Sequence, residues 1–265
     1  MSHPTNDAIL VESDGPVRIV TLNRPDARNA IVQDVKDALL RIWDELADDL
    51  DVRAVVLTGA GSAFSAGGDI ANFPNVAADG DYRRRIRLRN GRKIIDSLTN
   101  FPLPLVVAVN GPAVGLGCSI ASLGDVIYAS TNAFFADPHV SIGLVAGDGG
   151  AATWPLMMSL ARAKEYILTG DRIPADEAYR LGLVNHVVPP EELMSSALAM
   201  AHRLAAQPRQ AVQETKRALN LHIQRAAYAV LDVAMTAESE SFLTDEHQAR
   251  VQAFLDRSSK GSAKA

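Results

Sequence analysis

Two glycine-rich segments are places where backbone amide groups could take part in chemistry. The first is AGSAFSAGGDI at residues 60–70, and the second is NGPAVGLGCSIA at residues 110–121. Each follows an apolar run typical of a buried strand, and glycine lets the chain turn sharply and lets another group approach closely. If both turns lie at one end of the same sheet, an N–H group from each could stabilise one developing oxyanion. Two tight turns without a ligand would need the same glycines, so glycine content alone leaves both interpretations open.

His139 and Asp148 are the side chains best suited to moving a proton. Imidazole titrates near neutral pH and can accept a proton from water. Asp148 follows nine residues later in the string GDGG, and a carboxylate beside an imidazole can fix its tautomer and stabilise the protonated ring. A structural histidine and a helix-capping aspartate are the alternative interpretation.

The elements that must position these groups alternate between strand and helix patterns. Asp14-Gly15 between two apolar runs predicts a hairpin over residues 9–22. Apolar residues at helical spacing predict a helix over residues 31–49, and continuous apolar runs predict buried strands at 52–58 and 105–109. Residues 75–82 are expected to form a surface segment, residues 134–150 are expected to be irregular, and helices are expected from about residue 190. This order predicts an α/β fold.

Composition excludes several classes of function. The chain has 265 residues with a net charge of −5, which gives no reason to expect a nucleic-acid partner. A single cysteine, Cys118, cannot form an intrachain disulfide, and no apolar run is long enough to cross a membrane. The six histidines show no metal-ligand spacing, and neither glycine loop has dinucleotide-binding spacing. We therefore expect a cytoplasmic protein with no metal site, no nucleic-acid partner and no membrane partner.

Four strings resemble the enoyl-CoA hydratase/isomerase (crotonase) superfamily in order and spacing. They are AFSAGGDI, VVAVNGPAVGLGCSIA, DVIYAS and YILTGDRIPADEAYRLGLVNHVV. The resemblance implies a spiral of ββα units over residues 1–195 that carries the oxyanion hole. It also implies a helical region at residues 196–265 that assembles trimers or dimers of trimers.

The same resemblance implies an acyl-CoA thioester substrate, with coenzyme A entering only as part of that substrate and no further cofactor. The backbone N–H groups of Gly68 and Leu116 would form the oxyanion hole. Arg28, Ala66, Phe254 and Lys260 would border the bound coenzyme A, and Phe254 and Lys260 would do so across a subunit boundary.

This chain departs from the hydratases at both acid–base positions. The two glutamates that position water in that family are replaced by Ser119 and by His139. Hydration by a glutamate pair therefore cannot be carried over, and His139, aided by Asp148, is expected to activate water instead. Ser119 is expected to be a small helix residue without a catalytic role. Glu238 could reach the acyl pocket, but a surface position is the preferred interpretation.

Three functions follow from these residues. The first is an acyl-CoA enzyme, either a lyase or a hydrolase. The string PHVSIGLVAGDGGAATWP also resembles the β-diketone hydrolase branch that includes 6-oxocamphor hydrolase, so the second is a hydrolase that cleaves a C–C bond without coenzyme A. The third is an acyl-CoA-binding protein without catalysis. Arginines and a lysine cluster on a predicted helix over residues 82–98, and a solvated helix face is their preferred interpretation.

Overall fold

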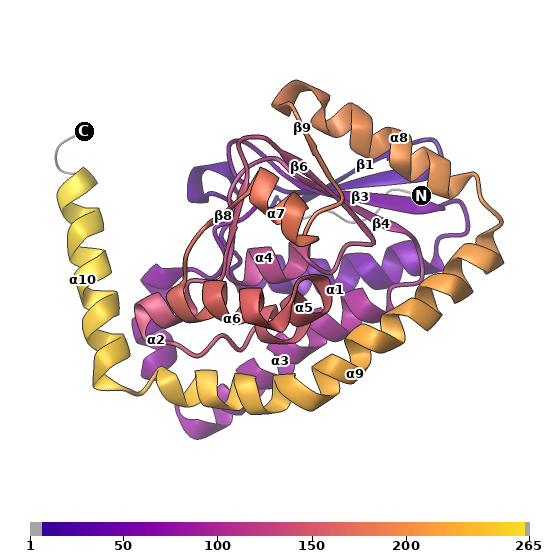
Figure 1. Ribbon diagram of the computed structural model, residues 1–265. Helices are drawn as coiled ribbons and strands as arrows, with labels where there is room; N and C mark the ends of the chain where they lie inside the picture. The colour runs from indigo at the N-terminus through magenta and orange to yellow at the C-terminus, as the bar shows by residue number, and fades with distance from the viewer. Residues whose placement is uncertain (1–6, 263–265) are drawn as a thin grey trace.

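A six-stranded sheet with the order β1-β2-β3-β4-β6-β9 forms the centre of the molecule (Figure 1). The computed structural model describes residues 7–262, without the side chains of residues 81 and 258–262. The strands of this sheet are β1 (Ile9–Asp14), β2 (Val17–Leu22), β3 (Ala54–Gly59), β4 (Leu105–Val109), β6 (Val126–Ser130) and β9 (His186–Val188). The first pair is an antiparallel hairpin, and every later pair is parallel. Because β2, β3, β4 and β6 are parallel, the loops that follow them gather at one end of the sheet.

A second, smaller sheet lies beside that end. It has the order β5-β7-β8 and consists of β5 (Ala113–Val114), β7 (Phe134–Ala136) and β8 (Ile173–Pro174). β5 lies within the second glycine loop, and β7 ends three residues before His139. The small sheet therefore brings two of the predicted site segments together.

Both faces of the large sheet are covered, which explains why its central strands are apolar without alternation. Along β3, Val55 and Leu57 face the larger core, whereas Ala54 and Val56 face a smaller core under α8 (Leu193–Ala205). Successive side chains of a strand point to opposite faces, so one strand supplies both cores.

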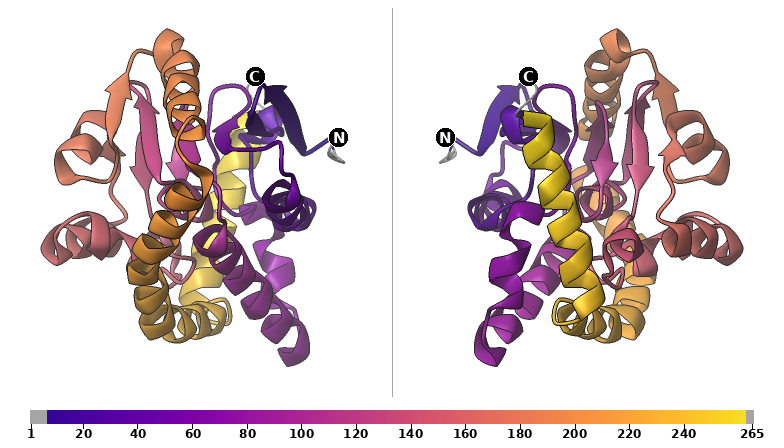
Figure 2. Two further views of the ribbon diagram at one scale, coloured as in Figure 1. Left: turned by 90° about the vertical axis from the view of Figure 1, so that its right-hand side faces the viewer. Right: turned by 90° about the vertical axis from the view of Figure 1, so that its left-hand side faces the viewer.

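Most of the remaining helices lie on the face of the sheet opposite α8 (Figures 1 and 2). The remaining helices are α1 (Gln33–Asp48), α2 (Phe73–Ala77), α3 (Asp81–Asn100), α4 (Leu116–Ala121), α5 (Gly150–Met157), α6 (Leu160–Thr169), α7 (Ala175–Leu181), α9 (Arg209–Ser241) and α10 (Asp245–Ser262). Short 3-10 helices are η1 (Pro25–Ala27), η2 (Ile70–Asn72), η3 (His139–Ile142) and η4 (Pro190–Glu192). α9 packs against α3 and α5, and α10 contacts α2 and η3.

The α/β class, the hairpin, the first long helix and the helical C-terminal region are confirmed. Residues 75–82 lie mostly at the surface, as expected, but α2 and the start of α3 give them helical structure that the sequence did not predict. Residues 134–150 are also more regular than expected, since they contain β7 and η3. The predicted boundary between residues 195 and 196 falls inside α8, whose buried face packs on the sheet. Within residues 7–262, no helix is both long and apolar enough to cross a membrane.

Candidate active site

The two glycine loops are joined to each other by backbone hydrogen bonds. Phe64 N donates to Pro112 O at 3.1 Å, and Val114 N donates to Ser65 O at 2.9 Å. Gly67 has a φ of +79°, and a Cβ added to it would lie 2.4 Å from the carbonyl oxygen of Val114. Only a residue without a side chain allows this approach. The loops therefore lie side by side, as the proposed pair of amide donors requires.

Gly68 and Leu116 each follow one of these contact points and line the same cavity of about 240 Å³. Leu116 is the first residue of α4, where a backbone N–H has no partner within the helix. Among residues 7–262, no acceptor receives a hydrogen bond from the backbone amide of Gly68 or of Leu116. Both donors are thus available to an oxygen atom of a ligand.

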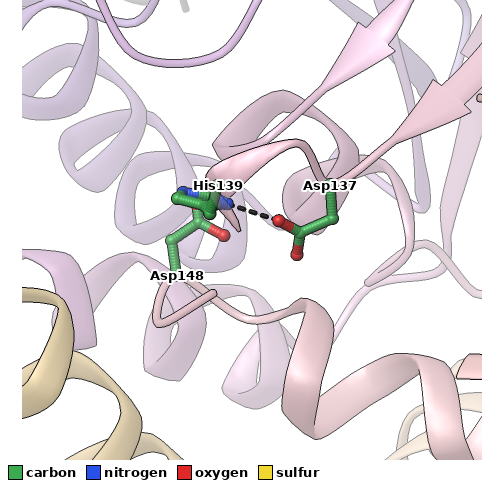
Figure 3. A group of neighbouring side chains, drawn as sticks. All are labelled: Asp137, His139 and Asp148. Carbon is green, nitrogen blue, oxygen red and sulfur yellow. Dashed lines mark hydrogen bonds and ion pairs between the residues drawn. The ribbon is translucent and has the colours of Figure 1, made fainter. Parts of the chain in front are cut away.

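His139 lies between two carboxylates (Figure 3). Its Nδ1 contacts Oδ1 of Asp137 in a short hydrogen bond, and its Nε2 lies 3.3 Å from Oδ2 of Asp148. A Cβ placed on Gly115 would lie 3.5 Å from the imidazole Cε1 and 3.9 Å from Oδ2 of Asp148. The imidazole of His139 and the carboxylate of Asp148 therefore lie beside the turn that precedes the Leu116 amide.

Ser119 and Gly149 hold Asp148 in place. The Ser119 hydroxyl donates a 2.9 Å hydrogen bond to Oδ1 of Asp148, which leaves Oδ2 to face His139. Gly149 adopts a φ of +138°, and a Cβ there would lie 3.0 Å from the Cβ of Ser119. Ser119 therefore positions a carboxylate, although the sequence predicted only a small helix residue there.

Glu238, which lies on α9, is close to the imidazole of His139. Its Oε1 lies 4.0 Å from Nε2 of His139, its side chain is 18% exposed and it lines the cavity. The expected surface position of Glu238 is therefore wrong. The residue is far along the chain from His139, and only the packing of α9 against α5 and α3 brings it to the site.

The charges of this cluster shift three pKa values. Burial alone would lower the pKa of His139, but the negative charges of Asp148 and Asp137 outweigh burial and raise it well above 6.5. Burial acts to raise the pKa of Asp148, yet the charge and hydrogen bond of His139 lower it overall. Burial raises the pKa of Glu238 from 4.5 to about 7. The site thus holds a charged imidazole beside a carboxyl group that titrates near neutral pH.

Ligand atoms of Asp137, His139 and Asp148 all lie within 4.8 Å of one another, a spacing that a metal ion could bridge. However, both ring nitrogens already face a carboxylate oxygen. Hydrogen bonding and ion pairing account for the cluster without a metal ion.

Comparison with known proteins gives the family. The enoyl-CoA hydratase/isomerase family model matches residues 12–261. The chain belongs to the enoyl-CoA hydratase/isomerase family. It is an enzyme of the crotonase superfamily, and its spiral core and helical C-terminal region follow the crotonase fold.

Members of this family resemble the chain over nearly its whole length. The short-chain-enoyl-CoA hydratase of Clostridium acetobutylicum is 36% identical over 94% of this chain and 95% of that protein. The crotonyl-CoA hydratase of Syntrophomonas wolfei is 34% identical over 94% of this chain and 95% of that protein. The crystal structure of an enoyl-CoA hydratase/isomerase from Mycobacterium paratuberculosis has a TM-score of 0.89 and 49% identity, covering 95% of this chain and all of that one.

The residues predicted to border coenzyme A are placed unequally in this family member. Ala66 lines the cavity, and its amide donates a 2.8 Å hydrogen bond to the carbonyl of Arg28, whose side chain is exposed. Phe254 lies on α10 and does not line the cavity of this subunit. Lys260 is also in α10, but its side chain is outside the described residues.

Three residues that the sequence did not single out lie at the site. Asp137 immediately precedes the Pro138-His139 dipeptide, and its carboxyl group is almost fully buried against the imidazole. Lys36 and Arg87 line the cavity, although the arginine-rich helix was expected to present a solvated face. Asp137 lies two residues before His139, and this short spacing could have pointed to it. Lys36 and Arg87 reach the cavity only through the packing of α1 against α3, which the sequence does not show.

Proposed function

We propose that this enzyme adds water across the double bond of an enoyl-CoA thioester. The observation that carries the proposal is the presence, in one cavity, of two backbone amides without acceptors and an acid–base cluster around His139. The names of its relatives, a short-chain-enoyl-CoA hydratase and a crotonyl-CoA hydratase, support the same reaction.

The amides of Gly68 and Leu116 would accept the charge that develops on the thioester oxygen. Attack at the β-carbon converts the thioester into an enolate, so a donor aimed at this oxygen acts most strongly on the transition state. Loss of one such donor costs about 10²–10³ in rate in other enzymes. Because both donors are main-chain groups, the side chain of Leu116 does not remove the donor itself.

The proton transfers would be divided between His139 and Glu238. The sequence predicted that His139 acts as a base toward water, but the raised pKa of His139 keeps the ring protonated at neutral pH. A ring in that state can donate a proton and cannot accept another. In our proposal Glu238 activates the water in place of His139: ionised Glu238 takes a proton from water as the water oxygen bonds to the β-carbon, and the imidazolium of His139 gives its proton to the α-carbon.

The cycle closes when Glu238 returns its proton to His139. The two groups are 4.0 Å apart, which is within reach of a small side-chain movement or a single bridging water. Water supplies one proton and one hydroxyl group, and both end on the product.

A second candidate is hydrolysis of a cyclic β-diketone without coenzyme A. The pairing of His139 with Asp148 favours it, because the same pair could direct water onto a ketone carbonyl. In that reaction the C–C bond breaks to an enolate, which the amides of Gly68 and Leu116 would bind in the same way.

A substrate screen tests these functions. Crotonyl-CoA and a cyclic 1,3-diketone would be assayed with wild type, with His139→Ala and with His222→Ala, whose ring is exposed on α9. We expect turnover of crotonyl-CoA that falls by about 10²–10⁴-fold in His139→Ala and is unchanged in His222→Ala.

The other outcomes of the screen are also decisive. Turnover of the diketone alone would replace hydration by the second candidate. Tight binding of acyl-CoA in a calorimeter with no turnover of either compound would indicate an acyl-CoA-binding protein. Full activity in His139→Ala would remove this residue from the mechanism.

We also propose that coenzyme A enters only as part of the substrate and that the chain self-associates as a trimer or a dimer of trimers. Arg28 is exposed next to cavity-lining Ala66, a position suited to a phosphate group. Exposed apolar side chains on α9, including Tyr228 and Val233, support a subunit interface. Phe254 and Lys260 would then serve the site of a neighbouring subunit. Cytoplasmic location stays a prediction.

A further inference from the structure

One lysine side chain lines the active-site cavity. Lys36 lies in the first turns of α1, is half-buried and lines the cavity. Within residues 7–262, its Nζ makes no hydrogen bond and no ion pair. An ammonium group removed from water without an acceptor is unfavourable, so a nearby anion would be strongly preferred.

The groups around Lys36 are charged but do not contact it. Burial lowers the pKa of Lys36, while the charges of Glu238 and Asp148 raise it and that of Arg87 lowers it. Arg87 lines the same cavity, and its Nε is bound to Oδ2 of Asp79 at 2.5 Å. Lys36 is therefore a cation of the cavity whose hydrogen bonds are left for a ligand.

Lys36 and the two amides come from different elements that line one cavity. The amides of Gly68 and Leu116 come from loops at the end of the sheet. Lys36 comes from α1, which packs against α3, and α3 in turn packs against α9. The imidazole of His139 lies beside Gly115, Glu238 lies 4.0 Å from that ring, and the charge of Glu238 acts in turn on Lys36. The acyl group of a ligand whose thioester oxygen is held by the two amides would therefore pass His139 and Glu238 before it reaches Lys36.

From this arrangement we infer that Lys36 selects an acyl group that carries a carboxylate at the end remote from the thioester. The inference rests on the proposed function, since it assigns the substrate class of the same site. The carboxylate would accept a charge-assisted hydrogen bond from Nζ, which is stronger than a neutral one. An unbranched acyl group ending in methyl would leave Nζ without an acceptor.

The test compares two enoyl-CoA substrates of equal chain length, one ending in methyl and the other in carboxylate. They would be assayed with wild type, with Lys36→Met and with Lys164→Met, an exposed lysine on α6. Methionine keeps the length and helix propensity of lysine but removes the charge. We expect Lys36→Met to lower kcat/KM for the carboxylate-ended substrate about 10- to 100-fold more than for the methyl-ended one, with the difference mainly in KM. Lys164→Met should change neither value.

Two results would overturn the inference. One is a wild type that prefers the methyl-ended substrate at every chain length. The other is an equal loss for both substrates in Lys36→Met, which would make Lys36 a counter-ion of Glu238 and not a specificity residue.

Binding separates this inference from the proposed function. Saturated analogues of both thioesters would be titrated calorimetrically into the His139→Ala variant, which is expected to bind without turnover. Preference for the carboxylate-ended analogue, lost on adding Lys36→Met, supports Lys36 recognition even if hydration fails. Equal binding of both analogues would contradict it, whatever reaction the enzyme catalyses.

Discussion

The hydroxyl of Ser119 donates a 2.9 Å hydrogen bond to Oδ1 of Asp148. Ser119 occupies the position where the family resemblance places a glutamate. The carboxylate beside it belongs instead to Asp148, in the loop between η3 and α5. Asp148 is thereby fixed with its other oxygen 3.3 Å from His139. Asp148 therefore supplies a carboxylate near position 119, although the residue at position 119 itself has none.

Ser119→Ala should weaken catalysis without disturbing the fold. The variant removes one hydrogen bond to Asp148, so the carboxylate would hold His139 less firmly. A hydrogen bond contributes about 0.5–1.5 kcal/mol, which predicts a fall in kcat/KM of about 2- to 13-fold. Ser195→Ala, an exposed serine on α8, is the control. Equal effects of the two variants on kcat/KM would contradict a positioning role.

Glu238→Gln should lower activity and raise stability, depending on pH. The pKa of Glu238 is about 7 in the folded protein and 4.5 as its ordinary value. The unfolded chain therefore ionises first, and the folded protein loses stability as pH rises from about 4.5 through about 7. A neutral glutamine avoids this cost. Above pH 7 we expect a gain of up to about 3 kcal/mol in the free energy of unfolding, and little change below about pH 4.

Urea unfolding at both pH values measures this gain, and Glu240→Gln, exposed on the same helix, is the control. In parallel, the pH profile of kcat/KM should rise toward about pH 7 in wild type. That rise should be absent in Glu238→Gln. A variant that keeps the acidic limb, or that is less stable than wild type near pH 8, would exclude Glu238 as the base.

Asp137→Asn should lower the pKa of His139. Burial by itself lowers this pKa, and the charges of Asp148 and Asp137 raise it overall. Removing one charge should move the alkaline limb of kcat/KM to lower pH by about one unit or more. NMR titration of the ring measures the pKa directly, with exposed Asp176→Asn as the control.

The same variant should also be less stable at neutral pH. A group with a raised pKa stabilises the fold fully below its unfolded value and loses that contribution as pH rises through its folded value. The loss of stability in Asp137→Asn should therefore shrink toward alkaline pH. An unchanged titration of His139 would show that its contact with Asp137 does not control its charge.

Gly67→Ala should separate the two oxyanion loops. Gly67 and Gly15 both have positive φ, but only a Cβ on Gly67 would meet backbone, 2.4 Å from Val114 O. Gly15 has nothing within 4 Å of such a Cβ. Gly15→Ala should therefore cost about 1 kcal/mol of stability through its backbone conformation alone. Gly67→Ala should cost more and should also lower kcat, because the Gly68 amide moves. Thermal unfolding and steady-state kinetics measure both effects, and equal costs would argue against close contact of the loops.

Much of the fold was predictable from local patterns. The hairpin at β1 and β2, the buried strands β3 and β4, and α1 follow from apolar periodicity and from Asp14-Gly15. These elements are specified by residues close together in the chain, so the sequence shows them directly. Short elements such as α2 and β7 were missed because contacts with distant segments stabilise them more than local preference does.

Sequence alone determined the family, the two glycine loops and the pairing of a histidine with an aspartate in place of a glutamate pair. Tertiary structure decided which charges surround that histidine. Asp137 follows β7, Asp148 lies in a loop, and Glu238 reaches the same imidazole from α9. Lys36 lines their cavity from α1. The reason is physical: a pKa depends on burial and on charges a few ångströms away, and both are set by packing between segments that the chain keeps far apart.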